Sequence, residues 1–275
     1  MRTRYLGWLL AGLLPLGAAH GESYVVGVER QSFQPHYWVD EQGEYRGFAR
    51  EVLDLFARSE RIELSYRPLA VTELTGRLLK GEVDLKYPDS PEWADDLKAG
   101  KPMAYSEPVV GYVDGVLVEP QRVGQGVETL QRLAMVQGWT PRGYQSRIDE
   151  GKVQLVQGND LRQMIRQALK KQADGAYFNV VVATYYLDNI RARPGALVFD
   201  PSLPHTRGTF QLSSSRHPEL IQRFNRFLAE HKGEVDALKA QYRVEANLDS
   251  EYMGLEQWKV DFLERQKSKG APAKP

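Results

Sequence analysis

The feature that most constrains the fold is an alternation of strand-like and helix-like segments, which occurs twice along the 275-residue chain. The first occurrence consists of these apolar or alternating runs and amphipathic stretches: 23–30, 47–60, 61–69, 71–81 and 82–88. Such a β-α-β-α-β order is typical of a parallel sheet covered by helices. We expect Pro88 to end the third strand, because proline donates no ladder hydrogen bond.

The second occurrence lies within residues 130–187 and is bracketed by two extended segments, 105–121 and 195–214. A strand is followed by Gly138-Trp139-Thr140-Pro141 and a helix, so that Thr140 is expected to lie at a helix start. A further helix is expected after Asn159 or Asp160, both of which are good N-caps. The chain therefore predicts an α/β protein with two sheet-and-helix units.

The N-terminus has the pattern of a secretory signal peptide over residues 1–21. Arg2 and Arg4 precede an apolar run at 5–16, and small residues follow it. A membrane anchor is the alternative, but the run is short for a span of about 20 residues. The chain has no cysteine, so we expect neither disulfides nor a lipid anchor at the cleavage site. Together these features predict a periplasmic location.

Charge and residue types exclude several classes of function. Lys+Arg and Asp+Glu both number 36, so there is no basic excess of the kind that binds nucleic acid. The five histidines show no metal-ligand spacing, and no G-x-S-x-G elbow occurs. We therefore expect no metal site, no cofactor and no catalytic activity.

Seven short stretches mark the order of elements along the chain: "YVVGVER", "YRGFAREVLDLFA", "LTGRLLKGEVDL", "YSEPVVGYVDGVLV", "VQGWT", "ALKKQADGAYFN" and "PELIQRFNRFLAEHKGEVDALKAQY". In this order they resemble the family 3 extracellular solute-binding proteins, the periplasmic receptors associated with polar amino acid ABC transporters. The resemblance implies the type II periplasmic-binding-protein fold, in which two α/β lobes joined by two crossings close on a ligand by hinge motion.

On this basis the chain is divided as follows: 1–21 signal peptide, 22–117 first part of lobe 1, 118–207 lobe 2 with hinge segments, 208–246 return to lobe 1, 247–266 an extra C-terminal helix, and 267–275 a disordered tail. The extra helix carries an apolar stripe that is expected to pack against a domain, with a partner site as the alternative.

The resemblance also implies where a ligand would lie, but the usual amino acid anchors are altered. In the family an arginine after the third strand pairs with the α-carboxylate, whereas no arginine occurs here between Arg77 and Arg122. Lys86 is the nearest cation, and Asn179 stands near the position of the acidic residue in lobe 2. The predicted ligand-binding residues are therefore aromatic and polar ones: Tyr37, Trp38, Lys86, Tyr87, Asp89, Trp93, Tyr105, Trp139, Thr140, Tyr177 and Asn179.

Several of these residues have a structural alternative. Tyr37 and Trp38 could cover a sheet edge, Trp93 could pack its own loop, and Lys86 could face solvent. The predicted function is capture of a small polar or aromatic-bearing solute by a monomer and delivery to an ABC importer. The alternatives are a sensor module that docks on a membrane receptor and an accessory protein of a periplasmic enzyme system.

Overall fold

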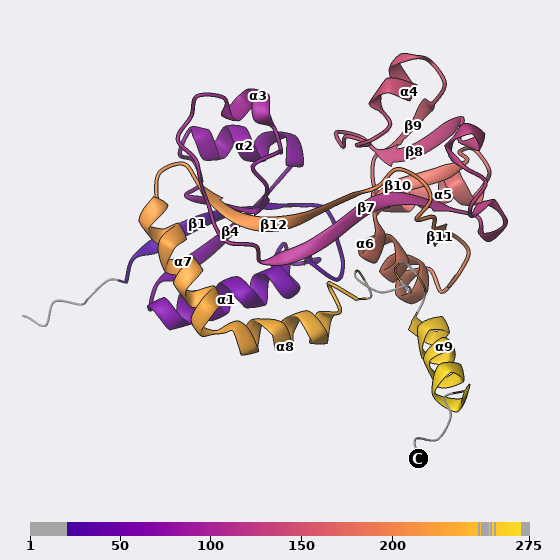
Figure 1. The fold of residues 1–275 in the computed structure, drawn as a ribbon. Helices are drawn as coiled ribbons and strands as arrows, with labels where there is room; N and C mark the ends of the chain where they lie inside the picture. The colour runs from indigo at the N-terminus through magenta and orange to yellow at the C-terminus, as the bar shows by residue number, and fades with distance from the viewer. Residues whose placement is uncertain (1–20, 247, 249–252, 254, 256, 271–275) are drawn as a thin grey trace, which may run out of the picture.

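A computed structural model describes residues 21–246, 248, 253, 255 and 257–270. The predicted signal peptide, residues 1–21, therefore lies outside the described residues except for Gly21. The described residues form two α/β lobes whose strands share one long sheet, ordered β4-β1-β5-β12-β7-β10-β8-β9 (Figure 1).

Each end of this sheet is built from three parallel strands whose first member lies in the middle. Lobe 1 contains β1 (Ser23–Glu29), β4 (Glu63–Leu69) and β5 (Leu85–Asp89). Lobe 2 contains β8 (Arg132–Val136), β9 (Gln154–Gly158) and β10 (Gly175–Asn179) in the equivalent order. The two alternating segments of the sequence thus fold into two units of the same topology.

Two long antiparallel strands connect the lobes. β7 (Val110–Val118) and β12 (Thr206–Ser214) pair from Phe210↔Val110 to Thr206↔Asp114, and Figure 1 shows them running from one lobe into the other. β12 also pairs with β5, and β7 with β10. The short strands are β2 (Trp38–Val39), β3 (Tyr45–Arg46), β6 (Ala104–Tyr105) and β11 (Val198–Phe199).

Helices cover both faces of lobe 1, with α2 and α3 above the sheet and α1, α7 and α8 below it in Figure 1. The helices below the sheet pack through their apolar faces: Phe56 of α1 lies edge-to-face on Phe224 of α7, with ring centroids 4.9 Å apart. The helices are α1 (Phe48–Glu60), α2 (Val71–Leu79), α3 (Asp95–Lys98), α4 (Gln145–Asp149), α5 (Leu161–Leu169), α6 (Val180–Tyr185), α7 (Pro218–Glu230), α8 (Lys232–Tyr242) and α9 (Gln257–Gly270). A π-helical stretch, Tyr186–Ile190, continues α6.

Local expectations are corrected at two positions. Pro88 does not end the third strand, because β5 continues to Asp89. Its missing N–H falls where the pairing of β5 with β12 shifts register, so no ladder bond is lost there. Thr140 does not lie at a helix start, since α4 begins at Gln145. Of the two N-cap candidates, it is Asp160 that caps α5, accepting a 2.7 Å hydrogen bond from Gln163 N.

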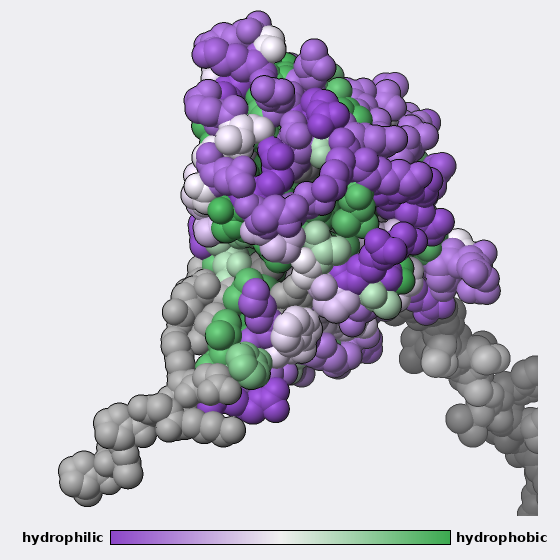
Figure 2. Space-filling view, turned by 90° about the vertical axis from the view of Figure 1, so that its right-hand side faces the viewer, coloured by the Kyte–Doolittle hydropathy of each residue, from purple (hydrophilic) through white to green (hydrophobic). Residues whose placement is uncertain are grey.

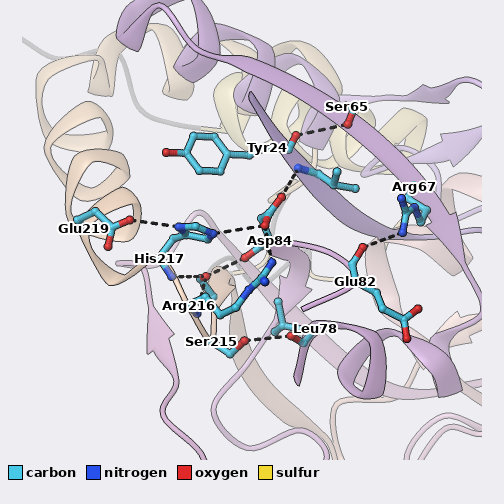
Figure 3. A network of polar contacts seen from close by, with 12 residues as sticks. Tyr24, Ser65, Arg67, Leu78, Glu82, Asp84, Ser215, Arg216, His217 and Glu219 are labelled. Atoms are coloured by element: carbon cyan, nitrogen blue, oxygen red, sulfur yellow. Dashed lines mark hydrogen bonds and ion pairs between the residues drawn. The ribbon is translucent and has the colours of Figure 1, made fainter. Parts of the chain in front are cut away.

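Asp84, which lies just before β5, holds three parts of lobe 1 together (Figure 3). Its carboxylate accepts a 2.8 Å hydrogen bond from Val25 N of β1 and a 2.7 Å bond from Arg216, and it lies 3.3 Å from His217 Nε2. Arg216 and His217 immediately precede α7. The acidic residue of the "GEVD" stretch therefore joins the start of β5 to β1 and to the returning chain.

The segment after α8 runs from lobe 1 to lobe 2. The Glu245 carboxylate accepts a 2.6 Å hydrogen bond from Gly111 N of β7, and Leu248 packs with Val180 and Phe199 of lobe 2. A cavity of about 270 Å³ lies beside this segment, lined by residues that include Pro35 of lobe 1, α6 and Trp258 of α9.

Of the predicted helix at 247–266, the structure describes 248, 253, 255 and 257–266, and the remaining positions lie outside the described residues. α9 covers Gln257–Gly270, so 267–270 of the predicted tail belong to this helix. Trp258 and Phe262 expose 57% and 49% of their surface, and in Figure 2 apolar surface gathers in the lower part of an otherwise mostly hydrophilic face. Within the described chain no helix is both long and apolar enough to cross a bilayer.

Candidate functional site

A cavity of about 600 Å³ lies between the two lobes. Residues that follow β1, β5 and β8 reach it, together with residues on the crossing strands β7 and β12. The carboxyl ends of parallel strands from both units therefore face one crevice, where α/β sheets bind ligands. A volume of this size falls in the range of small-molecule sites.

Aromatic rings form a continuous wall of the cavity. The lining rings are Phe33, Tyr37, Trp93, Trp139 and Phe210. Trp139 of lobe 2 lies 5.7 Å from Phe33 of lobe 1 between ring centroids, and it stacks on Phe178 at 4.4 Å. Phe210 of β12 lies 6.2 Å from Phe33 and 5.7 Å from Trp93. The wall therefore joins both lobes and one crossing strand.

Charged side chains complete the lining. The carboxylates are Glu29, Glu92, Asp95, Asp96 and Asp114, and the cations are Lys86 and Arg142. Acids thus outnumber bases among the lining residues. No group of histidine and carboxylate side chains suited to a metal ion occurs in the part of the chain that the structure describes.

Lys86 belongs to a buried polar cluster centred on Asp89. Its Nζ donates to Asp89 Oδ1 at 2.9 Å and to Thr75 Oγ1 at 3.1 Å. Lys98 Nζ reaches the same Asp89 oxygen at 3.1 Å and Ser90 O at 2.7 Å, and Ser213 Oγ donates to the other oxygen at 2.6 Å. The cluster fixes the end of β5, the start of its loop and α3, which lines the cavity.

Two carboxyl groups in the lining have perturbed pKa values. Burial raises the pKa of Asp114 to about 7, while its cross-strand neighbour Asn179 and the charge of Arg142 act in the opposite direction. Burial also raises the pKa of Glu29, against hydrogen bonds donated by Tyr37 and Gln31. Both groups lose hydration in the protein, so both favour the neutral form when no cation is near.

One ion pair bridges the mouth of the cavity. Arg142 of lobe 2 donates from Nη1 to the Glu92 carboxylate at 3.0 Å and from Nη2 to the Glu92 carbonyl at 2.9 Å. Both side chains are partly or largely exposed, 37% for Arg142 and 72% for Glu92. The lobes are therefore in contact across the cleft, in an arrangement that encloses the cavity.

The structure brings five of the predicted ligand-binding residues into the cavity lining, namely Tyr37, Lys86, Trp93, Trp139 and Thr140. Lys86 faces the cavity and not bulk solvent, since it is 4% exposed. These residues come from the loop after β1, from β5 and its following loop, and from the loop after β8. They are the members of the predicted set that could touch one bound molecule.

Six predicted residues do not line the cavity: Trp38, Tyr87, Asp89, Tyr105, Tyr177 and Asn179. Tyr87 lies in the core beneath β5, and Tyr177 packs on Tyr144 in the second core of lobe 2. The Asp89 carboxylate is paired with Lys86 and Lys98 in the buried cluster. Tyr105 lies beside the same cluster, with its ring centroid 5.1 Å from Lys98 Nζ.

The remaining two residues have structural contacts of their own. Asn179 caps α6 by accepting from Val182 N, and Trp38 lies against Gly47 at the β2–β3 hairpin. Both contacts are local to the chain.

The sequence interpretation missed Glu29, Asp114 and Arg142 as lining residues. Asp114 carried a signal, because it is the one charge within the apolar run "VGYVDGVLV" that forms β7. Glu29 also carried a signal, because it lies at the carboxyl end of the first strand, and parallel sheets bind ligands at that edge. Arg142 carried none, since nothing local shows that it reaches Glu92, which lies fifty residues earlier in the chain.

Comparison with known proteins supports the same architecture. A solved histidine kinase sensor domain with similarity to periplasmic binding proteins has a TM-score of 0.67 at 20% identity, covering 81% of this chain and 96% of that one. An ancestral arginine-binding protein bound to arginine has a TM-score of 0.65 at 15% identity, covering 81% of this chain and 99% of that one. An ancestral amino acid-binding protein, a precursor of cyclohexadienyl dehydratase, has a TM-score of 0.64 at 19% identity, covering 80% of this chain and 94% of that one.

At these identities the structural likenesses establish the fold alone. No curated protein sequence matches the chain significantly. The family model of the bacterial extracellular solute-binding proteins, family 3, matches residues 24–245, which is most of the chain and includes both lobes and both crossing strands. The resemblance inferred from the seven short stretches is thereby confirmed, and the chain belongs to the bacterial extracellular solute-binding proteins, family 3.

Proposed function

We propose that this protein is a periplasmic receptor that captures a small solute in the interlobe cleft and delivers it to an ABC importer. The observation that carries the proposal is the 600 Å³ cavity whose wall is shared by both lobes. A solute enclosed there contacts both halves at once, so its binding favours the closed arrangement over an open one. Tyr37, Lys86, Trp93, Trp139 and Thr140 are the proposed contacts from the predicted set.

A thermal-shift screen of amino acids, amines, aromatic acids and sugars tests the binding step. A solute that binds the folded state raises the melting temperature by mass action. Trp139→Ala is expected to weaken the identified solute by about 1–3 kcal/mol, the cost of losing an aromatic contact at a binding hot spot. Phe262→Ala is the control, because Phe262 is an exposed ring on α9 and lines neither this cavity nor the 270 Å³ cavity. Equal affinities for the two variants would remove the cleft assignment.

A sensor module is the second candidate function. A solved sensor domain of a histidine kinase shares the fold, and α9 presents the exposed rings of Trp258 and Phe262 to solvent. Deleting the gene separates the two roles once the solute is known. Loss of solute uptake supports transport, whereas normal uptake with a lost transcriptional response to the solute supports sensing.

A further inference from the structure

The two cations that line the interlobe cavity are already engaged by acids of the protein. Lys86 pairs with Asp89 at 2.9 Å, and Arg142 holds both the carboxylate and the carbonyl of Glu92. A ligand carboxylate would have to compete with these internal partners for either cation. Neither side chain offers the free, forked donor set that makes arginine a strong carboxylate anchor.

The lining acids are in the opposite situation. Within the described residues neither Glu29 nor Asp114 has a cation within ion-pair distance. Glu29 is bound only by the neutral donors of Tyr37 and Gln31, and Asp114 lies opposite Asn179 on the neighbouring strand. Glu29 is buried and Asp114 is partly buried, so a carboxylate charge at either position without a direct ion pair is costly, and a cationic ligand lowers that cost.

Aromatic rings surround the same space. Phe33, Trp93, Trp139 and Phe210 line it together with these acids. Ring faces attract cations, and desolvated cation–π contacts are worth about 2 kcal/mol or more. Rings next to a carboxylate therefore suit a compact ammonium group joined to a flat apolar portion.

The entrance carries the same sign of charge. Asp95 and Asp96 occupy the first turn of α3, and both are exposed and line the cavity. Negative charge around a cleft with apolar walls raises the local concentration of cations and speeds their association. The acids at the entrance, the aromatic walls and the acids of the interior thus all favour a positively charged ligand.

From these contacts we infer that the cleft selects an organic ammonium cation with a flat apolar portion and no carboxylate. This inference rests on the proposed function, since it names the class of solute held in that cleft. Asp114 is assigned as the charge partner of the ammonium group, with the rings of Trp139 and Phe33 against its apolar portion.

Three small molecules that differ by one group each test the inference. Phenethylamine carries the ring and the ammonium group, L-phenylalanine adds a carboxylate, and 2-phenylethanol replaces the ammonium group with a neutral hydroxyl. Isothermal titration of the mature protein should give a dissociation constant at least about tenfold lower for phenethylamine than for either relative. Asp114→Asn should weaken phenethylamine at least about tenfold, because one partner of a desolvated charge pair is lost. Asp149→Asn, an exposed acid on α4, is the matched control and should change affinity less than twofold.

The outcomes separate this inference from the proposed function. If L-phenylalanine binds as tightly as phenethylamine, the cation inference is overturned while solute capture stands. Equal binding of 2-phenylethanol, or an Asp114→Asn variant that retains its melting temperature and its affinity, overturns it as well. If none of the three binds, the inference fails, and the wider solute screen still decides whether the cleft binds any small molecule.

Discussion

Removing the carboxylate of Asp89 is expected to destabilise lobe 1 strongly. Asp89 has no exposed surface, and Lys86 and Lys98 are only 4% and 8% exposed. In Asp89→Ala both ammonium groups stay buried, Lys86 with Thr75 and Lys98 with the Ser90 carbonyl as their remaining partners. Leaving a buried charge without its partner costs about 3–5 kcal/mol, so the free energy of unfolding should fall by that amount.

Urea denaturation followed by circular dichroism measures this change, provided that the transition stays two-state. Lys98→Met is the comparison variant, because it removes one of the two buried cations and leaves Lys86 paired with Asp89. It should cost about 1–3 kcal/mol, since the Ser90 carbonyl loses its donor. The reasoning is refuted if Lys98→Met costs as much as Asp89→Ala, because the buried charge on Asp89 would then not be what holds the cluster together.

Three further predictions concern the hairpin, the cavity acid and the closed mouth. Gly47→Ala should lower the free energy of unfolding by about 1–3 kcal/mol in urea denaturation, because Gly47 has φ of 104° and an added Cβ would lie 2.8 Å from His36 O. The raised pKa of Asp114 adds stability that is fully present below the carboxyl's ordinary pKa of 3.8 and is lost as pH rises toward about 7. The melting temperature should therefore decline between pH 4 and 7, and Asp114→Asn should make this decline smaller. Arg142→Ala should change unfolding free energy by less than about 1 kcal/mol, since its pair with Glu92 is exposed, yet it should increase the radius of gyration in small-angle scattering if this contact holds the lobes closed.

The repeated alternation of strand and helix was sufficient to predict two α/β units, because each unit is local in sequence. The individual site residues were harder to assign where a strand is buried on both faces. All five residues of β5 are buried, so no polar alternation tells which side chains face the cleft. Lys86 lines the cavity, whereas its neighbour Tyr87 points into the core, as side-chain alternation along a strand requires.

The same ambiguity applies to β10. Tyr177 was predicted in the cleft, but it is Phe178 that stacks on Trp139, while Tyr177 joins the second core of lobe 2. Asp89 shows a different limit, because one of its partners, Ser213, lies 124 residues away. Pairings of that length depend on how the crossing strands return, which local patterns do not encode.

The segment after α8, which contacts β7 through Glu245 and lobe 2 through Leu248, has a consequence for motion between the lobes. The chain that leaves α8 lies below the crossing strands in Figure 1, on the opposite side from α2 and α3. We expect a rotation that opens the cleft above these strands to narrow the 270 Å³ cavity below them, beside Pro35 and Trp258. Because packed protein is nearly incompressible, side chains that fill this cavity should then restrict opening of the cleft.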